Sequence, residues 1–282
     1  MALWDKIGSS GSVEDRRGMS TGGIAVSGVT GLILFLAMMF LGGQDNTMLD
    51  QVLNQVVQQQ GTTQTADQPT QFDGADDYEV FTSKVLGSNN DVWSGIFTAS
   101  GQQYTPPKLV LFRQATQSGC GYASSAVGPH YCPEDQTIYL DETFFDELQK
   151  RFGGSSGDVA QAYVISHEVS HHVQNLKGDM DQMMQAQQMG GDEANQLSVA
   201  LELQADCYAG VWASSLRDLG VFESDNEIQE AISAAESVGD DRIQEKMTGS
   251  VNPESWTHGS SAQRVSAFKT GYTTGDAAQC KM

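Results

Sequence analysis

The chain has 282 residues, of which 39% are hydrophobic, so it is long enough and apolar enough to form one large domain or two small ones. It carries 36 Asp and Glu against 15 Lys and Arg, a net charge of -21 that repels the phosphates of nucleic acids. Binding to nucleic acid is therefore not expected, and an acidic substrate is disfavoured unless a local patch reverses the field.

The first 22 residues are polar and glycine-rich, and an uncharged apolar run from Ile24 to Leu41 follows them. As a helix this run would be roughly 27 Å long, close to the hydrocarbon thickness of a bilayer. A cleaved signal peptide is the alternative, but its apolar region is usually only about 7–15 residues and ends in a small-residue cleavage site, which this sequence lacks. We therefore expect an uncleaved transmembrane helix over residues 23–43.

The basic residues near the apolar run predict its orientation. Lys6, Arg16 and Arg17 precede it, whereas the next basic residue after it is Lys84. The positive-inside rule then predicts a single-pass membrane protein. Residues 1–22 would be a short cytoplasmic segment, and the rest of the chain would lie outside, in a periplasm or at the cell surface.

The rest of the chain divides by composition. Residues 44–77 are rich in Gln and Thr and predict a flexible linker, which leaves residues 78–282 as the folded domain. Two short β-type runs, KLVLFRQ at 108–114 and QTIYLD at 136–141, come first. Helices are expected afterwards, at about 141–153, 158–177, 193–219, 226–238 and 260–272. This order predicts an α+β fold with a small β-sheet followed by a mostly helical part.

The segment HEVSH in the helix at 158–177 indicates a metal site. At about 100° per residue, His167 and His171 lie one turn apart, and Glu168 falls on the same side of the helix. Two neutral imidazoles at this spacing can hold one Zn²⁺, and the adjacent carboxylate can take a proton from metal-bound water. His172 points about 100° away from His171 and is expected outside the site.

A catalytic zinc ion needs a third protein ligand. Glu202 and Asp206 are one turn apart on a single face of the helix at 193–219, in otherwise apolar surroundings where an unpaired carboxylate is costly. We expect Glu202 to be the third ligand and Asp206 to be the hydrogen-bond partner of a ligating histidine. The alternative is the solvated face of an amphipathic helix.

The segment SWTHGSSAQRVSAF adds a further candidate. His258 stands directly before a helix start, where it could donate to the oxyanion of a tetrahedral intermediate. Position alone favours a structural loop histidine over a catalytic one, and the catalytic prediction for His258 depends on the family resemblance given next. Arg264, about one turn into that helix, is expected to pair with Asp206 or another carboxylate of the site.

Five segments together resemble the "putative neutral zinc metallopeptidase" family of bacterial membrane-anchored proteins: SVEDRRG, SGCGYASSAVGPHYCPEDQTIYLDETFF, HEVSHHVQNLKG, LELQADCYAGVWA and THGSSAQRV. The resemblance covers most of the chain except the Gln/Thr-rich linker. It implies a zincin fold with a gluzincin-type site in which Glu168 is the general base. The implied zinc ligands are His167, His171 and Glu202. THGSSAQR is also similar to the segment after the active site of heat-shock type membrane metallopeptidases, although a proline follows the histidine there and Gly259 follows it here.

The predicted function is that of a membrane-anchored zinc metallopeptidase, which hydrolyses the peptide bonds of a peptide or protein substrate. The strand near residues 137–140 is expected to be the edge with which an extended substrate pairs, with an internal strand as the alternative. Two other classes of function remain open. One is a zinc-binding scaffold or inactive homologue, which the intact Glu168 disfavours, and the other is a zinc hydrolase of a non-peptide amide.

The four cysteines are Cys120, Cys132, Cys207 and Cys280, and none of them forms a C-x-x-C pair, so a zinc ribbon is not expected. In an extracytoplasmic domain they predict disulfides. Cys120 and Cys132 flank a short glycine-containing loop and are expected to pair, which leaves Cys207 for Cys280, although four cysteines permit three pairings. Metal ligation by Cys207 is a weaker alternative, because the helix turns this side chain away from Glu202.

Overall fold

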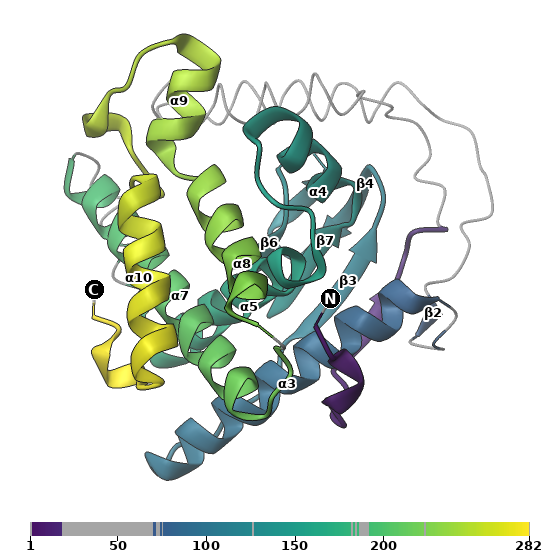
Figure 1. The fold of residues 1–282 in the computed structure, drawn as a ribbon. Helices are drawn as coiled ribbons and strands as arrows, with labels where there is room; N and C mark the ends of the chain where they lie inside the picture. The colour runs from purple at the N-terminus through teal and green to yellow at the C-terminus, as the bar shows by residue number, and fades with distance from the viewer. Residues whose placement is uncertain are drawn as a thin grey trace.

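A computed structural model of the chain describes residues 2–18, 70–71, 74, 76–125, 127–181, 183, 185, 192–222 and 224–281. These residues form an α+β fold around helix α5 (Asp158–Lys177), which packs against the β-sheet on one side and against other helices on the other (Figure 1). The transmembrane helix predicted at residues 23–43 and most of the linker predicted at 44–77 lie outside the described residues. In the part of the chain that is described, no helix is both long and apolar enough to cross a membrane.

The main sheet has five strands in the order β2-β1-β3-β7-β6. Strands β1, β3 and β7 run parallel, while β2 and β6 are antiparallel to their neighbours at the two edges. The strand bounds are β1 Val13–Asp15, β2 Thr70–Gln71, β3 Lys108–Phe112, β6 His130–Cys132 and β7 Thr137–Asp141, and a separate hairpin consists of β4 Ala115–Ser118 and β5 Gly121–Ser124. The substrate edge predicted near 137–140 is wrong, because β7 is an internal strand paired on both sides, and the edge strand is β6.

The helices predicted from the sequence are present, with small shifts at their ends. The helix bounds are α3 Asp77–Ala99, α4 Thr143–Glu147, α5 Asp158–Lys177, α7 Asp192–Asp218, α8 Asp225–Ser237, α9 Asp240–Thr248 and α10 Ser261–Thr274. The helix predicted at 141–153 consists of α4 and a π-helical turn, Leu148–Phe152, that ends at Gly153 with a φ of 72°. Short 3-10 turns lie at Trp4–Lys6, Pro253–Ser255 and Ala277–Gln279.

Helix α3 was not predicted, and its buried face explains why. Apolar residues such as Val85 and Trp93 are buried on this face, but polar residues lie between them. The Trp212 indole N–H donates to Ser88 Oγ at 2.9 Å, and Ser166 Oγ donates to Asn89 Oδ1 at 2.8 Å. Buried polar groups with satisfied hydrogen bonds thus interrupt the apolar stripe on which a sequence-based prediction depends.

Residues 2–17 belong to the folded domain. Strand β1 pairs in parallel with β3 in the middle of the sheet. The backbone N–H of Ala2 and the indole N–H of Trp4 donate to Asp158 Oδ2 at 3.1 and 2.7 Å, at the start of α5. A Cβ atom on Gly87 would lie 2.6 Å from the backbone nitrogen of Ser10, so the N-terminal segment also touches the backbone of α3. The folded unit therefore includes residues 2–17 and does not begin at residue 78.

This packing corrects the predicted topology. Arg17 forms an ion pair with Asp76 at 2.6 Å, so the two ends of the intervening chain lie together. A strand cannot pair with its neighbour across a bilayer, because the ladder hydrogen bonds need direct contact between the backbones. A cytoplasmic segment at 1–22 and an extracytoplasmic domain at 78–282 therefore cannot both be correct.

Both predicted disulfides are present. Cys120–Cys132 joins the turn of the β4–β5 hairpin to edge strand β6, and Cys207–Cys280 ties the C-terminal segment to α7. All four cysteines are thus paired. The alternative of metal ligation by Cys207 is wrong, because its sulfur is bonded to Cys280.

Helices α7 and α10 cross in backbone contact at two glycines. A Cβ atom on Gly271 would lie 1.9 Å from the carbonyl oxygen of Cys207, and one on Gly210 would lie 2.1 Å from that of Phe268. Only glycine allows this approach. The close crossing brings Arg264 of α10 against Asp206 of α7.

Candidate metal centre

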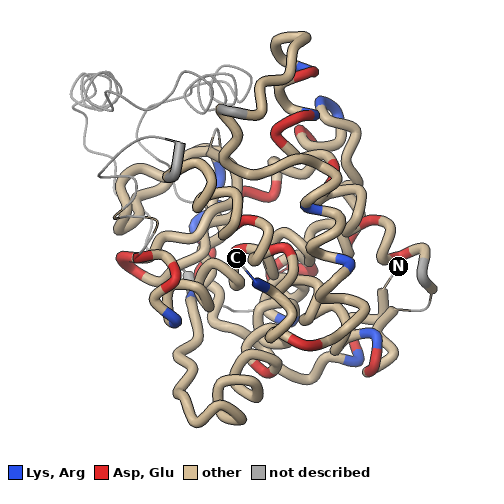
Figure 2. The backbone as a smooth tube through the Cα atoms, turned by 90° about the vertical axis from the view of Figure 1, so that its left-hand side faces the viewer, with Lys and Arg blue, Asp and Glu red and all other residues tan. Residues whose placement is uncertain are grey.

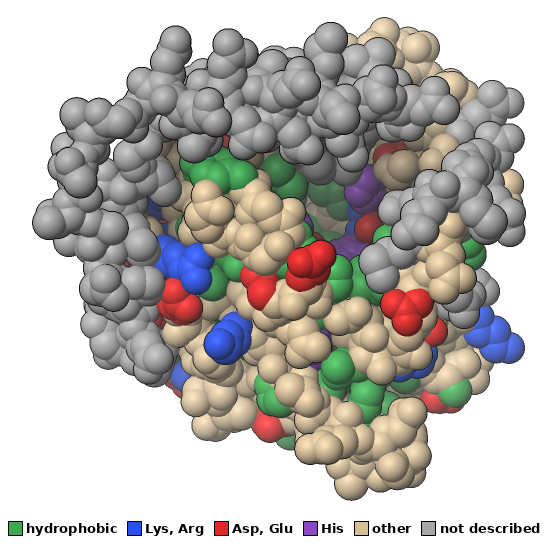
Figure 3. Space-filling model, turned by 180° about the vertical axis from the view of Figure 1, so that it is seen from behind, with side chains coloured by type: hydrophobic (Ala, Val, Ile, Leu, Met, Phe, Trp, Pro, Cys, Tyr) green, Lys and Arg blue, Asp and Glu red, His purple; other side chains and the backbone are tan. Residues whose placement is uncertain are grey.

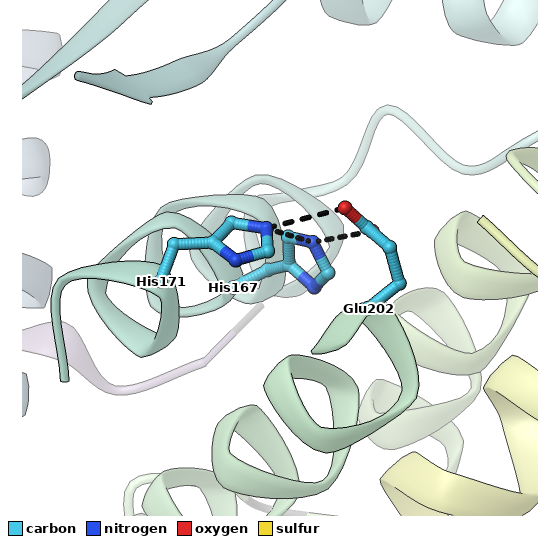
Figure 4. Close-up of side chains that lie close together, drawn as sticks. All are labelled: His167, His171 and Glu202. Carbon is cyan, nitrogen blue, oxygen red and sulfur yellow. Dashed lines mark hydrogen bonds and ion pairs between the residues drawn. The ribbon is translucent and has the colours of Figure 1, made fainter. Parts of the chain in front are cut away.

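Three side chains from two helices converge on one point (Figure 4). His167 and His171 come from α5 and Glu202 comes from α7. The two Nε2 atoms are 3.1 Å apart, and the Glu202 oxygens lie 3.1 Å from His167 Nε2 and 3.4 Å from His171 Nε2. Tetrahedral ligands at the usual zinc distances are about 3.3 Å from one another. The spacing and the His₂Glu donor set therefore both fit a zinc ion.

In both His167 and His171, the other ring nitrogen, Nδ1, is hydrogen-bonded to a side-chain oxygen. His167 Nδ1 donates to Asp206 Oδ1 at 2.9 Å, and His171 Nδ1 donates to Gln174 Oε1 at 2.9 Å. Each Nε2 is therefore the atom that remains for a metal. The contact expected between Asp206 and a metal-site histidine is present. Gln174 was not predicted, although it lies three residues after His171 on the same helix.

Asp206 is the centre of a buried network. Arg264 Nε donates to Asp206 Oδ2 at 2.8 Å and its Nη2 donates to Oδ1 at 3.0 Å, so Asp206 is the expected partner of Arg264. The Tyr163 hydroxyl also donates to Oδ1. Burial opposes ionisation of Asp206, but Arg264 and His167 outweigh it and hold its pKa below the usual range. The carboxylate is therefore charged and fixes the ring of His167.

The two glutamates of the site have opposite environments. Burial raises the pKa of Glu168, and the neighbouring His171 and His167 offset this only in part. Burial would raise the pKa of Glu202 as well, but His258, His171 and His167 hold it well below its usual value. Carboxylates whose pKa values are driven apart in this way suit different tasks, a base that accepts a proton and an anion that binds a cation.

His167 is protonated when no metal is bound. Burial acts to lower its pKa, but the carboxylates of Asp206 and Glu202 outweigh burial and raise the pKa to about 10. His167 would have to lose the Nε2 proton to hold a metal ion, so binding would release a proton to solvent.

His258 lines the same pocket as the three candidate ligands. Asp240 holds it in place: the carboxylate accepts the backbone N–H groups of Thr257, His258 and Gly259 at 2.8, 2.6 and 2.9 Å, and it lies 3.3 Å from His258 Nδ1. Burial acts to lower the pKa of His258, but the Glu202 and Asp240 carboxylates raise it. The raised pKa favours the protonated ring, whose Nε2 can donate while Nδ1 faces Thr257 Oγ1 at 2.9 Å and Asp240 Oδ1 at 3.3 Å.

Gly259 and Asp240 explain why a glycine follows His258 and what holds this histidine in place. Gly259 has a φ of 84°, a conformation that proline, with φ near −65°, cannot adopt, so glycine is required after His258 in this loop. Asp240 was not predicted as a site residue. It follows Gly239 at the start of α9, far from His258 in sequence, and only the fold brings the two together.

His172 lies outside the metal centre, as expected, but it is fully buried. Its Nε2 donates to the carbonyl oxygen of Thr105 at 2.6 Å, and its Nδ1 accepts from the Tyr131 hydroxyl at 3.0 Å. Burial lowers the pKa of His172, so the ring is neutral. Because Tyr131 belongs to β6, this contact fixes the edge strand against the metal-binding helix.

The metal centre lies in a pocket of about 440 Å³. Figure 3 shows histidine side chains in a hollow bordered by hydrophobic ones. His130 and Tyr131 of edge strand β6 are part of the lining, and so is Glu168. The apolar wall includes Phe144, Leu148, Phe152, Val164, Leu201 and Ile243. Among the described residues, Asp and Glu occur in many segments of the backbone (Figure 2).

Comparisons with known proteins give one consistent result. The family model described as "Putative neutral zinc metallopeptidase" matches residues 2–282. The chain is 43% identical to the uncharacterized protein YpfJ of Escherichia coli K12, with 98% of this chain and 97% of that protein covered. It is 46% identical to the uncharacterized protein Rv2575 of Mycobacterium tuberculosis H37Rv, with 73% of this chain and 72% of that protein covered. No solved structure matches the chain.

Proposed function

We propose that this chain, which belongs to the "Putative neutral zinc metallopeptidase" family, hydrolyses peptide bonds at a zinc ion held by His167, His171 and Glu202. One observation carries the proposal. Three ligand atoms at zinc-compatible spacing share a pocket with a buried glutamate that is not one of the ligands. A purely structural zinc site has no use for such a base, because structural sites are closed by protein ligands.

The residues of the chain have distinct tasks in this proposal. Zinc, when bound, polarises the scissile carbonyl and brings the pKa of a water molecule towards neutrality. Glu168 takes a proton from the water molecule as the water oxygen adds to the carbonyl carbon. Glu168 then passes that proton to the amide nitrogen as the C–N bond breaks. His258 donates a hydrogen bond to the developing oxyanion. Asp206, Arg264 and Asp240 hold the two functional histidines, His167 and His258, in place.

Edge strand β6 supports a peptide as the substrate. Of the strands that the structure describes, β6 pairs only with β7, so none of them occupies its outer side. His130 and Tyr131 place this strand at the pocket rim. An extended peptide can therefore add to the sheet by β-augmentation and present its backbone to the metal centre. Edge strand β6 lies beside α5, the helix that carries His167 and His171, and this arrangement also supports a zincin-like fold.

The proposal predicts metal-dependent cleavage with an apolar preference. The purified full-length chain is incubated with a mixed peptide library, and new termini are identified by mass spectrometry. We expect cleavage next to bulky apolar side chains, because the pocket wall is largely aromatic and aliphatic. A chelator should stop the reaction and added Zn²⁺ should restore it. Cleavage that persists in the chelator would contradict the proposal, as would hydrolysis of non-peptide amides alone.

We also propose that the folded domain, with residues 2–17, lies on the extracytoplasmic side of a membrane that the apolar run at residues 24–41 contacts. Two observations support this location. All four cysteines form disulfides, which persist in oxidising compartments. The run at 24–41 is uncharged, and as a helix it would be about as long as the hydrocarbon core of a bilayer is thick.

Labelling with a membrane-impermeant maleimide tests this location in intact cells. Gly8→Cys reports on the N-terminal segment and Lys150→Cys on the rest of the domain, since both positions are exposed and the native cysteines are paired. We expect label at both positions without lysis. Label at both only after lysis would place the domain inside the cell, and label at one position alone would contradict the shared side.

A further inference from the structure

A chain of buried amide groups connects the metal centre to the C-terminus. Gln174 Oε1 accepts from His171 Nδ1 at 2.9 Å, and Gln174 Nε2 donates to Gln204 Oε1 at 2.9 Å. Gln204 Nε2 in turn donates to the carbonyl oxygen of Cys280 at 3.2 Å. Both glutamines are buried. The three hydrogen bonds lead from a candidate zinc ligand on α5, through α7, to the disulfide partner of Cys207.

Backbone carbonyls fix the direction of every bond in this chain. The carbonyl oxygen of Cys280 can only accept, so Gln204 must present Nε2 to it and Oε1 to Gln174. Gln174 Nε2 also donates to the carbonyl oxygen of Leu201 at 2.7 Å. Both of its N–H groups are thereby used, and Oε1 must face His171. A flipped amide at either glutamine would set a donor against a donor or an acceptor against an acceptor.

The fixed direction has a chemical consequence at His171. An oxygen facing Nδ1 requires a proton on Nδ1, which leaves the lone pair on Nε2. Nε2 is the atom that lies 3.1 Å from His167 Nε2 and 3.4 Å from Glu202 Oε1. The amide chain therefore selects the tautomer of His171 that a metal needs. It does for His171 what Asp206 does for His167.

We propose that Gln174 and Gln204 are positioning residues of the metal centre, and that the Cys207–Cys280 disulfide holds the carbonyl group at the outer end of their hydrogen-bond chain. Metal affinity then depends on a disulfide far from His171 in sequence. Opening this disulfide frees Cys280 to move away from Gln204, and the chain loses the acceptor that orients it. The inference rests on the zinc site proposed above.

Zinc affinity of the full-length protein, measured by competition with a chromogenic chelator, tests the proposal. Gln174→Met removes the oxygen at His171 and is expected to weaken zinc binding about 10–100-fold, the usual effect of losing an outer partner of a ligand. Gln204→Met should give a smaller loss, because Gln174 keeps its bond to Leu201. The paired change Cys207→Ser with Cys280→Ser should weaken binding to about the same extent as Gln204→Met.

Matched controls separate positioning from general destabilisation. Gln244→Met makes the same change at another buried glutamine, whose partners are Asn252, Ser255 and Trp256. The change of Cys120 and Cys132 to Ser removes the other disulfide. Both controls should keep wild-type zinc affinity. If Gln174→Met does not fold, Gln204→Met and the Cys207 and Cys280 variant carry the test.

The same titration distinguishes the ways in which the inference can fail. If the wild type binds zinc and all folded variants bind it equally well, the glutamines are only structural and the proposal is overturned. If both controls lose as much zinc affinity as the Gln174, Gln204 and Cys207–Cys280 variants, the effect is a general destabilisation of the fold, and the proposal is again overturned. A wild type that binds no zinc would end the proposed function and, with it, this inference.

Discussion

Glu168→Gln is expected to reduce peptide hydrolysis about 10²–10⁴-fold, the usual contribution of a general base, while the zinc content stays unchanged. The amide keeps the size of the side chain but cannot accept a proton from water. Glu168 is not one of the three candidate ligands, so its replacement leaves them intact. Initial rates of peptide cleavage at saturating zinc, together with zinc per chain, give both quantities.

Glu245→Gln is the matched control for this prediction. Glu245 is exposed on α9 and takes no part in the pocket lining, so the same change there should leave the rate within error of wild type. A Glu168→Gln protein that still cleaves at the wild-type rate would show that another group takes the proton. The assignment of Glu168 would then be wrong even if zinc is bound.

Arg264→Met is expected to lower the free energy of unfolding by about 3–5 kcal/mol, because it removes one of the two cations, Arg264 and His167, that face the buried Asp206 carboxylate. Arg264 and Asp206 are almost completely buried and are joined by two hydrogen bonds. Urea unfolding of the zinc-free protein measures the change without a contribution from metal binding.

Arg242→Met provides the comparison for this second prediction. Arg242 pairs with Glu236 at 2.6 Å, but both side chains are more than a third exposed, and such pairs contribute about 0–1 kcal/mol. A double variant, Arg264→Met with Asp206→Leu, should recover part of the lost stability, since the carboxylate that lost its Arg264 partner is removed as well. An Arg264→Met protein as stable as Arg242→Met would refute the central structural role of this ion pair.

The sequence was most informative where the site depends on local spacing. His167 and His171 lie one helical turn apart, as do Glu202 and Asp206, and helix geometry alone puts each pair on one face. The meeting of the two helices is not a local property. It could be expected only from the chemistry, because zinc needs a third ligand and buried carboxylates need partners.

The parts that were not predicted depend on contacts between distant residues. Strand β1 is three residues long and lies in a polar segment, so its place beside β3 cannot be recognised without the rest of the sheet. The order of the strands likewise decides that β6, and not β7, is the edge. Asp240 has its role only because the fold places it beside His258. Gln174 is an exception, because it lies one helical turn from His171 and local spacing could have indicated it.

The most direct test of the central claim is the amount of zinc per chain in the purified full-length protein, measured by mass spectrometry of the metal. Residues 2–17 must be kept, because they form part of the sheet. We predict one zinc ion per chain in the wild type, its loss in His171→Ala and Glu202→Gln, and its retention in His130→Gln, which changes a histidine of the pocket outside the ligand set. A folded wild type that takes up no zinc after reconstitution, or a His171→Ala protein with full zinc content, would contradict the metal centre described above.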